Sequence, residues 1–216
     1  MPTLQIYEIG AASAGNVLIQ AVDEHDYSLL EQECASIREQ TDVPFMMRAF
    51  LVEDWNRDLS PWEAPAVFGN AGFGNGAQDT LKAILDTCGD CEKTYFLGGY
   101  SLSGLFALWA GCVTDRFQGI AAASPSVWFP GFVDYLKAHP MLGKAVYLSL
   151  GDREEKTRNP VMSMVGNCIR TCRDILDAQS IPTELVWNQG NHFRDADKRT
   201  AHGFAWVLRR AAYGAS

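Results

Sequence analysis

The sequence predicts an α/β fold, a mostly parallel sheet with helices on both of its faces. Short apolar runs alternate with longer amphipathic segments five times along the chain, which is the pattern of strands joined by crossover helices. The runs are largely apolar throughout, as expected for parallel strands that are buried on both faces. At 216 residues the chain can bury a core without disulfides or metals, so we expect residues 1–216 to form a single domain.

The individual elements follow from these runs. A first strand over 3–9 alternates apolar and polar residues imperfectly, which suits the edge of a sheet. The other strands are expected at 16–22, 44–52, from 95 onward, 119–124, 145–151 and 183–188. The helices are expected at 27–39, 77–87, directly after Ser101, 131–139, 159–179 and 195–212. Asp26 or Ser28 should cap the first helix, and Pro160 should lie in the first turn of the helix over 159–179.

Composition excludes several classes of protein. The formal charge is −8 and Lys and Arg do not cluster, which argues against a nucleic-acid partner because a phosphate backbone needs a basic face. No stretch approaches the length of a membrane span, and the first residues contain neither a basic leader nor an apolar core. We therefore expect a cytoplasmic protein that does not act at a membrane, while the oligomeric state does not follow from the sequence.

The six cysteines could in principle bind zinc. Two closely spaced pairs would have to supply the sulfurs: Cys88 with Cys91, and Cys168 with Cys172. A zinc ribbon repeats the Cys-x-x-Cys spacing twice, however, and this chain does so once. The two remaining cysteines fit no ligand pattern: Cys34 and Cys112. We expect six reduced, mostly buried thiols, with no metal and no other cofactor.

The segment 95–109 has the form of a nucleophile elbow, in which a buried strand turns sharply at a serine into a buried helix. The turn strains the backbone at the serine, so the residues two before and two after it must be small. Gly99 and Ser103 meet this requirement around Ser101. If Ser103 were the nucleophile, Leu105 would occupy a small position, and it is too large. Ser101 is therefore the candidate nucleophile.

A nucleophilic serine needs a histidine base and an acid that orients this base. His192 directly follows the last expected strand, whereas the other histidines are poorly placed: His25, His139 and His202. For the acid, the Gly-x-x-acid spacing after Gly151 selects Glu154, and Asp152 remains the alternative. The chain order Ser101, acid, His192 is the order of the α/β-hydrolase fold.

The oxyanion that forms during acyl transfer needs two backbone N–H donors. One is expected from Leu102, directly after the nucleophile. The other is expected in the loop after the strand over 16–22, at Val22 or a neighbouring residue.

Five motifs together resemble one family of enzymes. They are Gly-Gly-Tyr-Ser-Leu-Ser-Gly-Leu-Phe-Ala-Leu at 98–108, Arg-Asp-Leu-Ser-Pro at 57–61, Ser-Pro-Ser-Val-Trp at 124–128, Gly-Asp-Arg-Glu at 151–154 and Gly-Asn-His-Phe at 190–193. The chain is similar to the esterase family of the α/β-hydrolase superfamily, and within it to the enterochelin (ferric-siderophore) esterases. The resemblance implies a carboxylic-ester hydrolase with Ser101, Glu154 and His192 as its triad. Two features depart from the family: Ser103 replaces a common glycine, and the additional N-terminal domain and lid elements are missing.

The resemblance also implies that the Trp55–Trp62 segment and the Ser124–Trp128 segment line the substrate cleft. The candidate substrate-binding residues are Trp55, Arg57, Trp62, Ser126 and Trp128. Their aromatic rings suit an aryl or medium acyl group, and Arg57 could meet an anionic substrate. The same aromatic residues could instead pin the long loop over 53–76 to the sheet. A loop of this length in a compact domain favours a functional cover, here over the active site.

The sequence thus predicts a serine hydrolase that cleaves carboxylic esters of small molecules through an acyl-serine intermediate. The natural substrate does not follow from the sequence; an aryl or siderophore-type ester is the candidate that the aromatic residues and the resemblance suggest. Two alternatives remain open: a non-catalytic binding protein with this fold, in which Ser103 spoils the elbow, and an acyltransferase or peptidase that uses the same triad.

Overall fold

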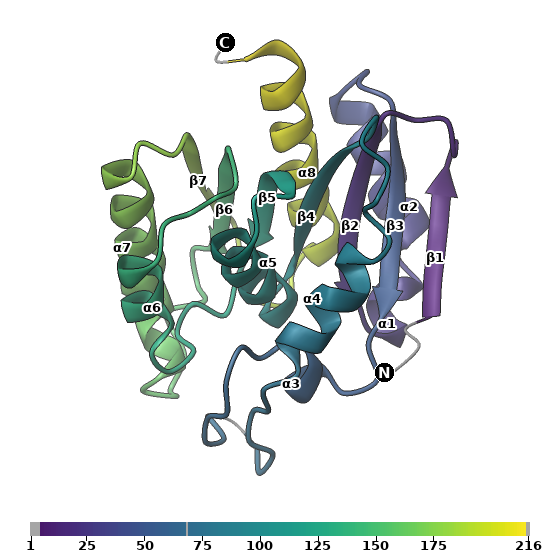
Figure 1. Cartoon of the computed structure of the whole chain (residues 1–216). Helices are drawn as coiled ribbons and strands as arrows, with labels where there is room; N and C mark the ends of the chain where they lie inside the picture. The colour runs from purple at the N-terminus through teal and green to yellow at the C-terminus, as the bar shows by residue number, and fades with distance from the viewer. Residues whose placement is uncertain (1–4, 68, 215–216) are drawn as a thin grey trace.

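The computed structural model describes residues 5–67 and 69–214 and contains a seven-stranded sheet with the order β1-β3-β2-β4-β5-β6-β7 (Figure 1). The strands are β1 Gln5–Gly10, β2 Asn16–Val22, β3 Phe45–Leu51, β4 Thr94–Tyr100, β5 Phe117–Ala123, β6 Val146–Gly151 and β7 Thr183–Asn188. The helices are α1 Glu24–Tyr27, α2 Leu30–Gln40, α3 Trp55–Asp58, α4 Ala77–Leu85, α5 Leu102–Val113, α6 Phe132–Ala138, α7 Val165–Ala178 and α8 Ala196–Tyr213.

The predicted α/β architecture is confirmed. Strands β2 to β7 pair in parallel, and β1 runs antiparallel to β3 at the edge of the sheet, where the sequence placed it. The residues expected to open this strand, at positions 3 and 4, lie outside the described residues. Because parallel strands end at the same side, their carboxyl ends form one rim, at the lower edge of the sheet in Figure 1.

Two apolar layers hold the helices to the sheet. Helices α4 to α7 share one buried cluster with the sheet, and α2 and α8 share the other. Helix α5 is apolar on all sides, so it can lie at the centre of its layer, and all its residues from Leu102 to Cys112 are buried. On the opposite face, a Cβ at Gly98 would lie 2.6 Å from the ring of Phe204, so this glycine lets α8 pack directly onto β4.

Several element boundaries differ from the sequence prediction. Helix α2 begins at Leu30 without a side-chain cap, so the expected caps Asp26 and Ser28 are wrong. The side chain of Asp23 instead caps the short helix α1 by accepting from the Asp26 N–H at 2.8 Å. Helix α7 begins at Val165, so the expected start at 159, with Pro160 in the first turn, is wrong. A short 3-10 helix, Met162–Met164, precedes α7, and Asn159 Oδ1 accepts from the N–H groups of Val161 and Met162 at its start.

The cysteines agree with the prediction of free, mostly buried thiols. All six are unpaired, and four are buried; Cys91 is exposed and Cys168 is half-buried. Within residues 5–67 and 69–214, no group of three or more His, Cys, Asp or Glu side chains is placed to hold a metal ion. Over the same ranges, no helix combines the length and the apolar composition that crossing a membrane requires.

Candidate active site

Ser101 lies in the turn between β4 and α5 with φ 57° and ψ −120°, a conformation that non-glycine residues rarely adopt. A Cβ at position 99 would lie 2.6 Å from the Cβ of Ser103, which explains why Gly99 is required there. The Ser103 hydroxyl is fully buried and donates to the Ala21 carbonyl at the end of β2, at 2.8 Å. Ser103 therefore ties the elbow to the neighbouring strand, and only Ser101 is accessible.

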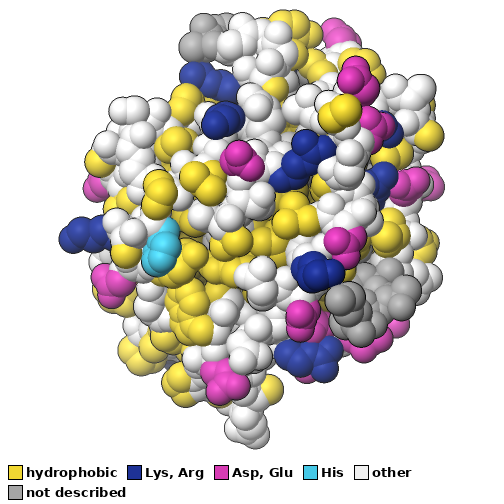
Figure 2. All heavy atoms as spheres, viewed as in Figure 1, with side chains coloured by type: hydrophobic (Ala, Val, Ile, Leu, Met, Phe, Trp, Pro, Cys, Tyr) yellow, Lys and Arg dark blue, Asp and Glu magenta, His cyan; other side chains and the backbone are white. Residues whose placement is uncertain are grey.

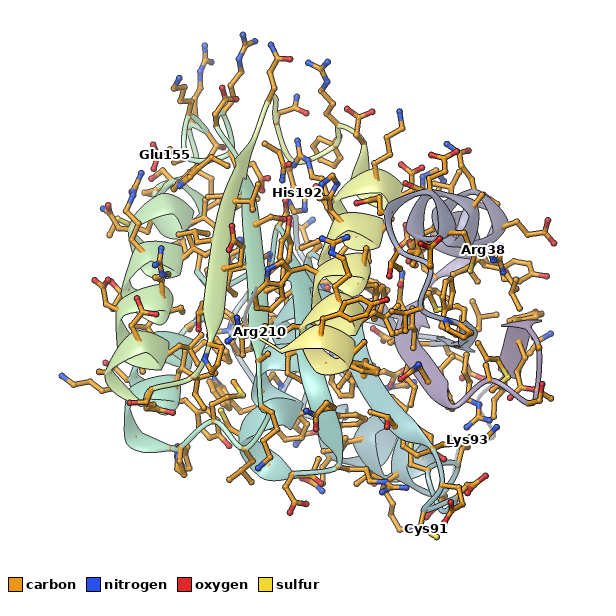
Figure 3. The ribbon with its side chains drawn as sticks, turned by 90° about the horizontal axis from the view of Figure 1, so that it is seen from above. Arg38, Cys91, Lys93, Glu155, His192 and Arg210 are labelled. Carbon is orange, nitrogen blue, oxygen red and sulfur yellow. The ribbon has the colours of Figure 1, made fainter. Side chains whose placement is uncertain are left out.

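The structure brings the three expected side chains together at the rim. His192 Nε2 lies 3.0 Å from Ser101 Oγ, and His192 Nδ1 lies 2.7 Å from Glu154 Oε2. Figure 3 shows His192 between the end of β7 and the start of α8. The hydroxyl, imidazole and carboxylate thus form one continuous chain of hydrogen bonds, with each ring nitrogen facing a different partner.

Glu154 is held in place by several donors, although its carboxylate is only 4% exposed. Its Oε1 accepts from the Gly151 N–H at 2.6 Å, the Ser124 hydroxyl at 2.8 Å and Arg199 Nη1 at 3.0 Å. These donors satisfy one oxygen and leave Oε2 to face His192. The buried charge is therefore paired and oriented at the same time.

Asp152, the alternative acid, has a different position. It is exposed, and its Oδ1 accepts from the Gly190 N–H at 2.8 Å. This bond joins the end of β6 to the turn that leads to His192. Asp152 therefore supports the backbone of the histidine loop, while Glu154 contacts the ring.

The sequence analysis missed two residues that hold the triad in place, Arg199 and Tyr100, and three that line the adjacent pocket, Phe73, Met162 and Phe193. Arg199, buried in α8, donates to Glu154 and to the carbonyls of the histidine loop. Tyr100 donates its hydroxyl to the His192 carbonyl at 2.7 Å, and burial raises the pKa of Tyr100 to about 12, so the hydroxyl stays protonated. Arg199 could have been found, because it lies four residues before the buried Gly203, on the apolar face of an amphipathic helix.

A pocket of about 360 Å³ opens beside Ser101 and His192. Ten residues line it: Trp55, Asn56, Phe73, Ser101, Leu102, Ser126, Trp128, Met162, His192 and Phe193. Three of the expected substrate-binding residues, Trp55, Ser126 and Trp128, line this pocket, and Ser126 Oγ lies 3.3 Å from Ser101 Oγ. The long loop contributes to the wall through α3 and through Phe73, which a single bridge joins to Ala64.

Two expected substrate-binding residues, Arg57 and Trp62, are not among the residues that line this pocket. The Arg57 guanidinium pairs with Asp58, with Nε 2.7 Å from Oδ1. The Trp62 indole donates to the Pro130 carbonyl at 2.9 Å and packs against Phe129. Trp62 thus clamps the loop to the segment after β5, which was the alternative interpretation of these aromatic residues.

The expected oxyanion donors lie on adjacent segments. Leu102 begins α5 and lines the pocket next to Ser101. Val22 ends β2 with its side chain fully buried, and it follows Ala21, the residue that Ser103 binds. The hydrogen bond from Ser103 to Ala21 therefore holds the elbow directly beside the end of β2. The role of Val22 as second oxyanion donor stays a prediction.

A scan against protein-family models and a search of curated proteins find no match to this sequence. Solved structures match over nearly the whole chain. Siderophore hydrolase EstA from Aspergillus nidulans is 16% identical, with a TM-score of 0.68, over 96% of this chain and 94% of that chain. An IroE-like serine hydrolase from Shewanella oneidensis is 14% identical, with a TM-score of 0.70, over 96% and 75%.

The enterobactin esterase FES from Shigella flexneri is 14% identical, with a TM-score of 0.62, over 97% of this chain and 56% of that chain. The resemblance to enterochelin esterases seen in the sequence is therefore confirmed at the level of structure. At these identities the similarity establishes the fold, and the chain is an α/β-hydrolase-fold protein.

Proposed function

We propose that this protein is a serine hydrolase that cleaves carboxylic esters of small molecules through an acyl-serine intermediate. The observation that carries the proposal is the hydrogen-bonded chain from Ser101 Oγ through His192 to Glu154, with distances of 3.0 Å and 2.7 Å. The names of the structural neighbours, a siderophore hydrolase, a serine hydrolase and an enterobactin esterase, support the same reaction class.

In the first half-reaction, Ser101 Oγ attacks the ester carbonyl while His192 Nε2 takes the hydroxyl proton. The imidazolium that forms keeps its proton on Nδ1, and this N–H donates to Glu154 Oε2. The oxyanion accepts from the Leu102 N–H and a second N–H at or near Val22, each contributing about 3 kcal/mol to the lowering of the barrier. The tetrahedral intermediate then collapses, and His192 gives its proton to the leaving alcohol.

In the second half-reaction, a water molecule gives a proton to His192 and attacks the acyl-serine. The carboxylic acid leaves, and the proton returns to Ser101 Oγ. Tyr100 and Asp152 support the backbone of the histidine loop, so the imidazole stays in line with both partners through these proton transfers.

The pocket favours an ester with an aryl or medium-length apolar group. Trp55, Phe73, Trp128 and Phe193 present aromatic surface, and such walls bind flat or apolar groups without requiring a charge. Arg57, the expected partner for an anionic substrate, lies outside this lining. A siderophore-type ester therefore remains a candidate substrate only because such esters could carry aryl groups that fit against these aromatic walls.

The six free cysteines support a reducing compartment, and a cytoplasmic location is part of the proposal on that basis. An excess of acidic over basic residues supports the absence of a nucleic-acid partner, and on the face drawn in Figure 2 the Lys and Arg side chains are interspersed with Asp and Glu.

A fluorophosphonate probe tests the reaction class, because it reacts covalently with activated serines. The wild-type protein should be labelled and should release p-nitrophenol from short p-nitrophenyl esters, and Ser101→Ala should do neither. Ser103→Ala is the matched control and should still be labelled, since the Ser103 hydroxyl faces Ala21. Equal labelling of wild type and Ser101→Ala would remove the assignment, and an inert wild type would favour a binding protein.

A further inference from the structure

Arg199 is a buried charge that the proposed mechanism does not use. Its side chain is 3% exposed, and it projects from α8 into the space beneath the rim. Burying an unpaired guanidinium lowers the free energy of unfolding by several kcal/mol, so the partners of Arg199 determine whether the charge can be tolerated there.

One nitrogen of the guanidinium contacts the segments that carry the nucleophile and the acid. Arg199 Nη1 lies 3.0 Å from Glu154 Oε1, 3.2 Å from Ser124 Oγ and 3.1 Å from Tyr100 Oη. Tyr100 directly precedes Ser101, and Ser124 directly follows β5. This nitrogen therefore bridges the carboxyl ends of β4 and β5 and the loop after β6.

The other nitrogen contacts the loop that carries the base. Arg199 Nη2 lies 3.3 Å from the Gln189 carbonyl and 3.1 Å from the Asn191 carbonyl, on either side of the turn before His192. The planar fork of a guanidinium can reach all these acceptors at once, whereas a lysine presents a single nitrogen.

On the side of the acid, the fork is closely packed. A Cβ at position 151 would collide with the Gly190 carbonyl and would lie 2.9 Å from Glu154 Oε1 and 3.1 Å from Arg199 Nη1, so Gly151 lets the histidine loop and the ion pair pack together. Arg199 does not line the pocket beside Ser101, and it therefore acts through other residues.

We propose that Arg199 is a positioning residue of the site, whose guanidinium fixes both the Glu154 carboxylate and the His192 loop in register with Ser101. The inference rests on the proposed hydrolase function. It assigns to α8 the task of holding together the segments that carry the acid and the base.

A second feature makes this inference testable by chemical rescue. On its outer side Arg199 lines a surface hollow of about 260 Å³. The other residues that line the hollow are Asn188, Gln189, Arg194, Asp195, Lys198 and His202. Truncating the Arg199 side chain would extend this hollow to the Glu154 carboxylate, so a free guanidinium ion could enter from solvent and occupy the vacated place.

The first experiment compares Arg199→Lys with Arg116→Lys on a short p-nitrophenyl ester. Arg116 also binds backbone carbonyls, those of Cys88 and Asp90, but it precedes β5 at the opposite rim. We expect kcat to fall about 100-fold in Arg199→Lys with KM within about twofold of wild type, because a misplaced base slows chemistry without altering the pocket. Arg116→Lys should retain wild-type kcat.

The second experiment adds guanidinium chloride to Arg199→Ala, well below concentrations that unfold proteins. We expect kcat of Arg199→Ala to rise at least about tenfold and to reach a plateau as guanidinium is added. Sodium chloride at the same concentrations should not raise kcat, and guanidinium should not raise the kcat of Glu154→Gln. If Arg199→Ala does not fold, the kcat and KM of Arg199→Lys decide the question, because a positioning role lowers kcat and leaves KM nearly unchanged.

Two outcomes would overturn the inference: wild-type kcat in Arg199→Lys, or a folded Arg199→Ala that guanidinium does not rescue. The fluorophosphonate probe separates this failure from that of the proposed function. Wild-type and Arg199→Lys proteins labelled at equal rates would exclude a role for Arg199 while leaving the serine assignment intact. An unlabelled wild type would instead exclude the hydrolase itself.

Discussion

Replacing Glu154 by glutamine changes the charge of the site while almost keeping its shape. Arg199 and Glu154 are 3% and 4% exposed, so the variant leaves a guanidinium buried without its counter-charge. Breaking a buried pair in this way costs about 3–5 kcal/mol of the free energy of unfolding. For a chain of this size, that corresponds to a melting temperature lower by roughly 6–20 °C.

The same substitution should also disable catalysis. If the glutamine amide N–H donates to His192 Nδ1, the neutral imidazole must carry its proton on Nε2. A protonated Nε2 can no longer accept the proton of Ser101. The loss of the correct tautomer is expected to lower kcat by about 10⁴-fold. Thermal unfolding followed by circular dichroism, together with p-nitrophenyl ester kinetics, measures both effects.

Asp152→Asn is the matched control, because Asp152 is exposed and accepts a single backbone N–H, from Gly190. Its stability should change by less than about 1 kcal/mol and its kcat by only a few-fold. A second control, Glu154→Gln with Arg199→Met, removes both charges and should regain much of the lost stability without regaining activity. The reasoning fails if Asp152→Asn loses more activity than Glu154→Gln, or if the single and double variants unfold at the same temperature.

Three further predictions concern the elbow, the pocket and the helix after β2. Gly99→Ala places a Cβ against Ser103 and should lower the free energy of unfolding by about 1–3 kcal/mol in urea titrations; an unchanged value would contradict the packing. Phe193, 89% exposed at the pocket, should affect binding alone, so Phe193→Ala should raise KM for aryl esters about two- to tenfold at constant melting temperature. Burial, together with the charge of Asp23, raises the pKa of Asp26 to about 6. Because the pKa of Asp26 is higher in the folded than in the unfolded protein, its protonated carboxyl group stabilises the fold fully below about pH 4, and this stabilisation is lost as the pH rises through about 6. Asp26→Asn should therefore stabilise the protein by about 1–2 kcal/mol at pH 7 and not at pH 4, and a pH-independent effect would exclude this cause.

The parts of the site that depend on chain topology could be predicted from the sequence. Apolar runs separated by helices require a parallel sheet, and the carboxyl ends of its strands meet at one rim whatever the loops do in detail. Ser101 follows such a run directly, and Glu154 and His192 lie three and four residues beyond the ends of β6 and β7. Their convergence therefore needed no knowledge of side-chain packing.

The parts that depend on packing between distant segments could not be predicted. Trp62 and Trp128 are equivalent in the sequence as aromatic residues near the rim. They differ because the Trp62 indole finds the Pro130 carbonyl, 68 positions away, while Trp128 faces the pocket. Arg199 has partners from four separate segments, and none of them lies within the reach of a local pattern.

The rim gathers features that oppose folding. Ser101 and Ser124 both have positive φ, at 57° and 43°, at the ends of the neighbouring strands β4 and β5. Both strained residues take part in the hydrogen-bond network, since Ser101 contacts His192 and Ser124 donates to Glu154. Beneath them lies the buried Glu154–Arg199 pair. Each of these features lowers stability locally, and the apolar layer around α5 and the packing of α8 against β4 must offset them. Because the strain and the buried charge lie at the same rim as the aligned hydroxyl, imidazole and carboxylate, relieving either one would loosen the alignment.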